Sequence, residues 1–193
     1  RGRAGDVAAL RALAKRFSVE AMRTVAIDGE RASSSAVREA LAEADFPRAA
    51  QLLGRPFSIG GRVAHGAKLG RSLGFPTANL RLRRMPPFTG IYAVRVHGLG
   101  ASPREAVASL GVRPTVAQRG DPLLDVFVFD FDADIYGRRI AVEFLHKIRD
   151  EARYPDLHSL TRQIRRDVLR AREFFARTAP AEPVGATPAA ART

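Results

Sequence analysis

The sequence predicts a mainly β fold, in which a small antiparallel barrel or sandwich is flanked by helical segments. Between residues 55 and 150 the apolar runs are short and are separated by Gly and Pro, as in strands joined by turns. The run Ile91–Val96 alternates in the way expected of a strand. Before and after this region, apolar residues recur every three or four positions, which is the period of an amphipathic helix.

Six apolar runs are the predicted strands. Turn residues such as Gly90, Gly98 and Gly137 punctuate them, and about six strands with frequent turns suit a small barrel or sandwich. The runs are Phe57–Ala64, Ala78–Leu82, Ile91–His97, Ala106–Leu110, Leu123–Phe129 and Ile140–Ile148.

Residues 1–53 have a different texture, with helical spacing interrupted by one strand-like run. Gly54 and Pro56 then give a helix stop followed by a proline. The predicted elements are a helix capped by Asp6 and reaching Phe17, a strand from Val19 to Ile27, a helix that begins after Ser34 or Ser35 with Glu39 in its first turn, and a helix over Pro47–Leu53.

The helical period returns at Asp156, which follows Pro155 and gives a good start signal. One face of this helix carries Leu157, Leu160, Ile164 and Val168 and ends near Phe174 and Phe175, so we expect it to pack on the barrel. Residues 177–193 are rich in Ala and Pro and are predicted to be a disordered tail.

Composition excludes several classes of protein. Hydrophobic residues make up 46% of the 193 positions, so a core can form, yet no run approaches a membrane span. The absence of Cys excludes disulfides and thiolate zinc sites, and the four His are too far apart for a local metal motif. The chain starts at Arg1 without a signal-peptide core, so we expect a cytoplasmic piece of a longer protein, and oligomeric state is left open.

The charge is strongly basic, at +12, and only three of the 32 basic residues are Lys. One interpretation is a compositional preference for Arg on solvated faces. The others are a ligand that carries phosphate or a nucleic acid. With no Trp and three Tyr, a platform for stacking bases is poorly supplied, so nucleic acid is the less favoured partner.

The stretch Gly60–Asn79 holds five Gly and three basic residues between two predicted strands. Glycine lets backbone N–H groups approach an anion closely, and Lys68 or Arg71 could meet phosphate oxygens. The spacing is neither that of a P-loop nor that of a Rossmann Gly-x-Gly-x-x-Gly turn, and a flexible surface loop is the alternative.

Thr77 and Asn79 follow this loop and are two residues apart, so on a strand they face the same side. A hydroxyl and an amide carbonyl are hard oxygen donors that could complete the shell of a Mg²⁺ held with nucleotide phosphates. Pro76, Thr77 and Asn79 are also ordinary turn residues, which is the alternative interpretation.

These residues carry a family resemblance. The segment Gly74–Asn79 resembles the Pro-Thr-Ala-Asn signature of riboflavin kinases, and further motifs follow in the same order, so that the resemblance covers about residues 55–175. It implies a six-stranded antiparallel Greek-key barrel with a C-terminal helix, and ATP- and Mg²⁺-dependent phosphorylation of the ribityl hydroxyl of riboflavin to FMN. The further motifs are Gly90–Val94, Leu110–Thr115, Asp134–Gly137, Val142–Leu145 and Ile148–Glu151.

The resemblance also implies a set of site residues. Thr77 and Asn79 would hold Mg²⁺ and phosphate, Gly66 and Arg71 would lie in the loop over ATP, Tyr136, Arg138 and Ile140 would border the nucleotide, and Arg149 would lie on the flavin side. Barrel packing is the alternative for Tyr136 and Ile140.

One position departs from the family pattern. The family places a Glu as the base in the strand where this chain has Asp125, which carries the same carboxylate on a shorter side chain. A displacement of about 1 Å can cost about a hundredfold in rate, so a reduced activity is one outcome. Glu143 is a possible substitute, but it matches another motif, and an outward-facing strand carboxylate is its simpler interpretation. The expected base is Asp125.

The amino-terminal residues resemble the end of the FMN adenylyltransferase module that precedes riboflavin kinase in bifunctional bacterial FAD-forming proteins. The resemblance rests on Arg1–Asp6 and Ser33–Arg38, and a Ser-rich turn before a helix suits a triphosphate. No His precedes His65, so the His-x-Gly-His motif of nucleotidyltransferases is missing here. Adenylyl transfer is therefore expected of a longer parent protein and not of these residues.

Three segments are predicted. Residues 1–53 are an adenylyltransferase remnant, which is a partial α/β nucleotidyltransferase segment. The kinase barrel and its helix cover 54–176, and the tail covers 177–193. Two other functions stay open: a flavin- or nucleotide-binding module whose turnover is impaired at Asp125, and an RNA-binding barrel suggested by the basic charge.

Overall fold

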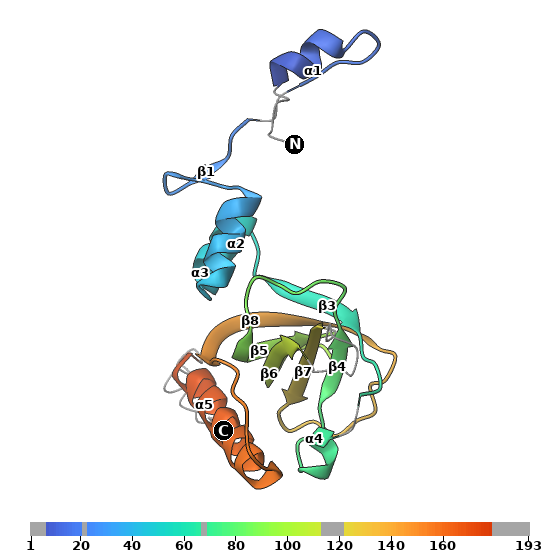
Figure 1. Ribbon diagram of the computed structural model, residues 1–193, viewed down its shortest axis with the longest axis vertical. Helices are drawn as coiled ribbons and strands as arrows, with labels where there is room; N and C mark the ends of the chain where they lie inside the picture. The colour runs from blue at the N-terminus through green and yellow to red at the C-terminus, as the bar shows by residue number, and fades with distance from the viewer. Residues whose placement is uncertain (1–6, 21–22, 67–68, 113–121, 179–193) are drawn as a thin grey trace, which may run out of the picture.

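Six antiparallel strands form one curved sheet in the computed structural model, which describes residues 7–20, 23–66, 69–112 and 122–178 (Figure 1). The strand order is β3-β8-β5-β6-β7-β4. The strands are β3 (Ser58–Arg62), β4 (Ala78–Arg81), β5 (Gly90–His97), β6 (Arg104–Val112), β7 (Pro122–Val128) and β8 (Arg139–Arg149). Every boundary lies within two residues of its predicted position, so the mainly β prediction is confirmed.

The sheet is nearly closed into a barrel by a single backbone bridge between its two edge strands. The bridge joins Ala64, just after β3, to Asn79 of β4, and the Ala64 N–H donates to the Asn79 carbonyl oxygen at 2.8 Å. A closed sheet has no exposed edge, and here the closure falls beside the Thr77–Asn79 segment.

Strand alternation separates the barrel interior from its outer face. On β8, Val142 and Phe144 are buried in the core while Glu143 between them points outward and bonds His97 Nε2 at 2.6 Å. Glu143 is therefore the outward-facing carboxylate that its strand position predicts.

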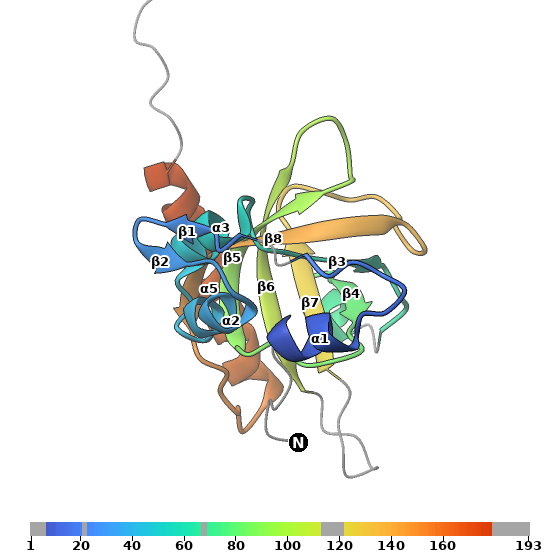
Figure 2. The same cartoon turned by 90° about the horizontal axis from the view of Figure 1, so that it is seen from above.

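The helix α5 (Leu157–Thr178) covers the outer face of the sheet beside β5 and β6 (Figure 2). Ala171 and Phe175 pack there against Ile91, Ala93 and Val107, which explains why β5 is buried on both faces. The Ser159 N–H donates to the Asp156 carboxylate at 2.7 Å, so the helix starts where predicted.

Two details of the predicted carboxyl-terminal segment are wrong. Leu157 is 57% exposed, because it lies in the first turn at the end of the helix. The helix also continues through Arg177 and Thr178, which were predicted to belong to the tail. The rest of the predicted tail lies outside the described residues.

A helical hairpin precedes the barrel, with α2 (Ser34–Ala42) and α3 (Phe46–Leu53) in contact. The cap of α2 is Ser33, not Ser34 or Ser35: its hydroxyl accepts from the Ala36 N–H at 3.1 Å. Gly54 ends α3 in the left-handed region at φ 68°, where glycine carries no Cβ penalty.

Phe46 of α3 sits in the aromatic core at one end of the barrel. Its ring centroid lies 5.7 Å from each of Phe88, Tyr92 and Phe144, and Phe46 is 3% exposed. The hairpin therefore shares the barrel core, although the predicted domain boundary falls after Leu53.

Replacing Phe46 with Ala is expected to lower the free energy of unfolding by about 3–5 kcal/mol, because it leaves a cavity among packed rings. Denaturant unfolding of the whole chain measures this change. Phe17, which is 61% exposed, is the matched control, and Phe17→Ala should leave the midpoint almost unchanged. Equal shifts for the two variants would contradict this packing.

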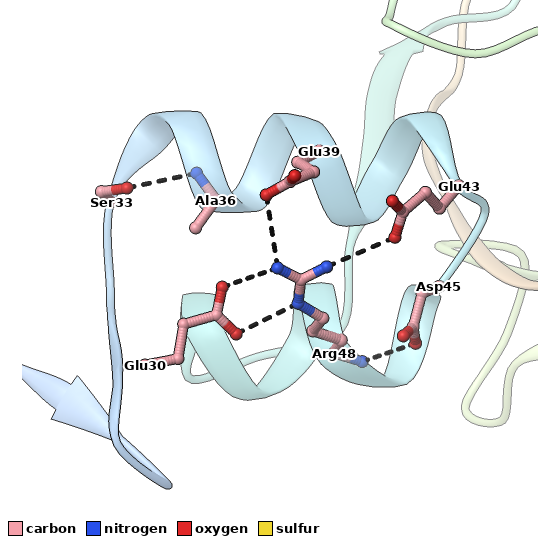
Figure 3. Close-up of polar contacts among 7 residues, drawn as sticks. All are labelled: Glu30, Ser33, Ala36, Glu39, Glu43, Asp45 and Arg48. Carbon is pink, nitrogen blue, oxygen red and sulfur yellow. Dashed lines mark hydrogen bonds and ion pairs between the residues drawn. The ribbon is translucent and has the colours of Figure 1, made fainter.

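Arg48 ties the segment before the hairpin to both of its helices (Figure 3). Its guanidinium bonds Glu30 through two nitrogens, at 2.7 and 3.1 Å, and also contacts Glu39 of α2 and Glu43, the residue that caps α2. The Arg48 hydrogen bonds lower the pKa of the Glu30 carboxyl, so the contact is a charge-assisted pair.

The strand predicted over Val19–Ile27 is wrong for most of its length. Of the described residues in this run, only Ala26 and Ile27 form a strand, β1 (Ala26–Ile27), which pairs with β2 (Glu30–Arg31) across a turn in which Asp28 and Gly29 have positive φ. A strand needs a neighbour, and this one finds a partner only where the chain folds back.

The first helix, α1 (Val7–Leu13), is shorter than predicted and buries none of its residues (Figure 1). Its predicted cap, Asp6, lies outside the described residues. None of the described helices combines the length and the apolar character needed to cross a membrane.

Candidate active site

The glycine-rich loop between β3 and β4 folds tightly enough that two of its glycines cannot carry a side chain. A Cβ at Gly66 would lie 2.5 Å from Asn79 Oδ1. A Cβ at Gly70 would run into the Phe75 carbonyl oxygen and would lie 3.1 Å from Thr77 Oγ1. The loop backbone is therefore pressed against the two residues expected to hold metal and phosphate.

The side-chain oxygen of Asn79 is buried without a hydrogen-bond donor among the described residues. Its side chain is 6% exposed, and its Nδ2 donates to the Thr77 carbonyl oxygen at 3.1 Å. Asn79 Oδ1 is buried and accepts no hydrogen bond from any residue that the structure describes. A buried acceptor without a donor is costly, so such an atom points to a ligand.

A cavity of about 300 Å³, here called the major cavity, lies between the loop, the sheet and α5. Aromatic and aliphatic side chains make most of its wall, which is typical of a small-molecule site. Its lining residues are Gly70, Leu73, Phe75, Thr77, Ile91, Val107, Ala108, Ser109, Asp125, Phe127, Arg149, Glu151, Ala152, Tyr154, Leu160, Ile164 and Asp167.

Asp125 of β7 brings a carboxylate to the major cavity. In the sheet it lies opposite Asn79 of β4 on one side and Ser109 of β6 on the other. Directly opposed residues place their side chains on the same face, so Asp125 and Asn79 are neighbours across the strands.

A smaller hollow, here called the loop pocket, adjoins the major cavity. It is lined by Gly66, Arg71, Pro76, Thr77, Asn79 and Tyr136. The Tyr136 ring packs against the His65 ring, with centroids 3.8 Å apart and ring planes tilted by 30°. Because Thr77 lines both spaces, the cavity with Asp125 and the pocket with Arg71 are adjacent at this residue.

Arg149, at the end of β8, is held by a buried carboxylate of α5. Its Nε and Nη2 donate to Asp167 at 2.9 and 2.6 Å, and its Nη1 donates to the Asp150 carbonyl oxygen. Burial alone would lower the pKa of Arg149, but the hydrogen bonds to Asp167, together with the charge interactions with Asp167, Tyr154 and Glu151, raise the pKa above its ordinary value.

A second carboxylate, Glu151, also faces the major cavity. Its oxygens lie directly over Gly111, where any Cβ would collide with them. Burial raises the pKa of the Glu151 carboxyl, and the nearby Arg149 opposes this shift. The motif Ile148–Glu151 contains this residue, but no role was predicted for it.

The structure brings together most of the predicted site residues. Thr77, Asp125 and Arg149 share the major cavity, and Gly66, Arg71, Asn79 and Tyr136 share the loop pocket with Thr77. Arg138 and Ile140 are in neither: Arg138 donates to the Gly98 carbonyl oxygen, and Ile140 is 2% exposed in the barrel core. The burial of Ile140 agrees with the alternative interpretation, in which its side chain packs inside the barrel. Lys68 lies outside the described residues.

Comparison with known proteins decides the family. Residues 53–175 match the family model described as Flavokinase: Riboflavin kinase. The chain belongs to the riboflavin kinase family. A bifunctional riboflavin kinase/FMN adenylyltransferase from Haemophilus influenzae is 48% identical over 176 residues, which cover 90% of this chain and 57% of that protein. The relative of the same name from Pseudomonas fluorescens is 52% identical, over 84% of this chain and 52% of its own length.

This riboflavin kinase chain thus spans a little over half the length of the curated relatives that it matches. Among solved structures, one described as a macrolide-efflux protein from Streptococcus pneumoniae is 32% identical, with a TM-score of 0.66 over 82% of this chain and 51% of that chain. The family resemblance and the predicted mainly β fold are confirmed.

Proposed function

We propose that this chain transfers the γ-phosphoryl group of ATP to the ribityl hydroxyl of riboflavin and releases FMN and ADP. The observation that carries the proposal is the position of Thr77, which lines both the major cavity and the loop pocket. A phosphate donor in the loop pocket and a hydroxyl acceptor in the major cavity would meet there, which is the positioning that phosphoryl transfer requires.

The residues present fit a Mg²⁺ ion, which we propose is held by Thr77 and Asn79 with the ATP phosphates. Asn79 Oδ1 is a buried oxygen that no described residue satisfies, and hydroxyl and amide oxygens suit this hard cation. Bound there, Mg²⁺ would neutralise charge on the phosphates. Among the described residues there is no cluster of three His, Asp or Glu side chains for a metal, which agrees with a site completed by the nucleotide.

Asp125 is proposed as the general base. Its carboxylate takes the proton from the ribityl hydroxyl as that oxygen forms a bond to the γ-phosphorus. The bond between the γ-phosphorus and the oxygen bridging it to the β-phosphate then breaks, and its electrons leave with ADP. The aromatic side chains of Phe75 and Phe127, whose rings pack edge to face, offer the major cavity a surface for the flavin ring.

For ATP we propose Arg71 as the phosphate-binding cation, Gly66 as the close backbone contact and Tyr136 as a border of the nucleotide, because all three line the loop pocket. Arg138 remains a predicted contact for nucleotide atoms beyond that pocket, whereas the Ile140 side chain is buried in the barrel core.

The test is FMN formation by the purified chain with riboflavin, ATP and Mg²⁺, followed by chromatography of the flavins. We expect FMN only when all three are present. Binding of riboflavin and ATP without FMN would favour the impaired binding module, and affinity for single-stranded RNA that falls steeply with salt would favour the RNA-binding barrel. Adenylyl transfer to FMN is proposed only for a longer parent protein that contains this chain. A cytoplasmic location also stays a prediction.

A further inference from the structure

Asp167 is a buried carboxylate to which the proposed reaction assigns no part. Among the described residues only two polar or charged side chains are buried, Asn79 and Asp167, and Asp167 is 3% exposed. It lies on the inner face of α5 and lines the major cavity. A charged group is rarely buried unless other groups satisfy it.

Three hydrogen bonds satisfy Asp167. Two come from Arg149, in a parallel fork at 2.9 and 2.6 Å, and the third comes from Gln163 Nε2 at 2.9 Å. The Arg149 guanidinium has five N–H groups, and its bonds to Asp167 and to the Asp150 carbonyl oxygen use three of them. The other two N–H groups of this planar guanidinium donate to no residue that the structure describes, and Arg149 lines the major cavity.

Stability alone is a weak reason for this pair. A buried ion pair contributes little over well-packed apolar side chains of similar volume, because removing two charges from water is costly. The helix already has other attachments to the barrel: Ala171 and Phe175 are buried against the sheet, and Arg172 forms a second fork with Asp130.

We propose that Asp167 is a positioning residue for riboflavin, which fixes the plane of the Arg149 guanidinium at the major cavity and cancels its charge. This inference rests on the proposed function and extends it to substrate selection. The two remaining N–H groups of Arg149 would donate to oxygen acceptors of the flavin.

The cancelled charge has a consequence for the product. Riboflavin is neutral and FMN carries a phosphate, so an uncompensated Arg149 in this cavity would favour FMN over riboflavin. With Asp167 paired to it, Arg149 adds no net positive charge to a cavity wall that also carries the carboxylates of Asp125 and Glu151, and the substrate is not at this disadvantage. Loss of Asp167 should therefore weaken riboflavin binding and shift the balance toward the product.

The experiment compares Asp167→Asn with Asp130→Asn in the whole chain. Both remove the carboxylate of an Arg–Asp fork between α5 and the barrel, but neither Asp130 nor Arg172 lines the major cavity or the loop pocket. For Asp167→Asn we expect the KM for riboflavin to rise about tenfold with the KM for ATP unchanged. The ratio of the FMN Kd to the riboflavin Kd should fall. Asp130→Asn should change none of these quantities.

The inference is overturned if Asp167→Asn leaves the riboflavin KM and the ratio of dissociation constants at their original values, or if Asp130→Asn shifts them equally. Should Asp167→Asn not fold, the double variant Arg149→Met/Asp167→Leu replaces the pair with apolar side chains. It should fold and still bind riboflavin about tenfold more weakly, whereas unchanged binding would refute the inference.

Riboflavin binding, followed through flavin fluorescence, separates this inference from the proposed function. If the original chain binds riboflavin but forms no FMN, the proposed reaction fails while the binding of the variants still decides the part of Asp167.

Discussion

Asp125→Asn is expected to lower kcat for FMN formation by about 10²–10⁴-fold, the usual contribution of a positioned general base. The amide cannot take the proton of the ribityl hydroxyl, yet it keeps the size of the side chain in the cavity wall. Riboflavin affinity should change little, because a base acts on the hydroxyl only as the new bond forms. Steady-state kinetics with a separate riboflavin titration measure both quantities.

Glu143→Gln is the matched control for this prediction. Glu143 is the other strand carboxylate considered as a base, but it bonds His97 on the outer face of the sheet and lines none of the described cavities. Its kcat should equal that of the unmodified chain. A loss at Glu143 comparable to that at Asp125 would move the base to Glu143.

Asp125→Glu examines whether the shorter carboxylate has impaired the enzyme. We expect a small change, because Asp125 already faces the cavity beside Thr77 and opposite Asn79. A large gain from a near-zero rate would instead identify the original chain as a binding module that has lost turnover.

Thr77→Ala is expected to lower kcat by about 10²-fold, as removal of one preorganised group that acts on transferring charge does. Thr77 lines both the major cavity and the loop pocket, and its proposed partners are the phosphate and the metal and not the flavin ring. Turnover should therefore fall much more than riboflavin affinity. The measurement is kcat across a Mg²⁺ titration, together with the Kd of riboflavin.

Thr77→Ser is the control, because it keeps the hydroxyl and removes only a methyl group. It should retain most of the activity and most of the Mg²⁺ response. If Thr77→Ala had the same kcat as the unmodified chain, Thr77 would have no part in the proposed active site. The adjacency of the two cavities at Thr77 would then no longer support phosphoryl transfer there.

The strands were predictable because their signals are local. In β5 and β8 the side chains that point into the barrel are apolar, and glycines such as Gly90 and Gly98 mark where strands begin or end. The segment Gly60–Asn79 could also be singled out from the sequence as a candidate binding segment, since its glycines and polar residues are close in sequence.

The failures concern residues whose role depends on distant partners. Asp167 was overlooked because a carboxylate among arginines on a helix resembles a solvated face, and only the approach of Arg149 from β8 explains its burial. Likewise, helical spacing over Pro47–Leu53 does not show that the side chain just before it, Phe46, reaches Phe88 and Phe144. The run after Val19 had strand composition but no neighbouring strand beyond its own turn.

The position of Phe46 among the barrel rings limits how this chain can be recombined with its relatives. In a chimera joined at the end of the helical hairpin, Phe46 would come from one parent and the barrel rings around it from the other. Mismatched ring sizes would then leave a void or a clash. A junction upstream of Ser33 would take Phe46 and the barrel rings from the same parent, so the core of that hybrid should pack without a void or a clash.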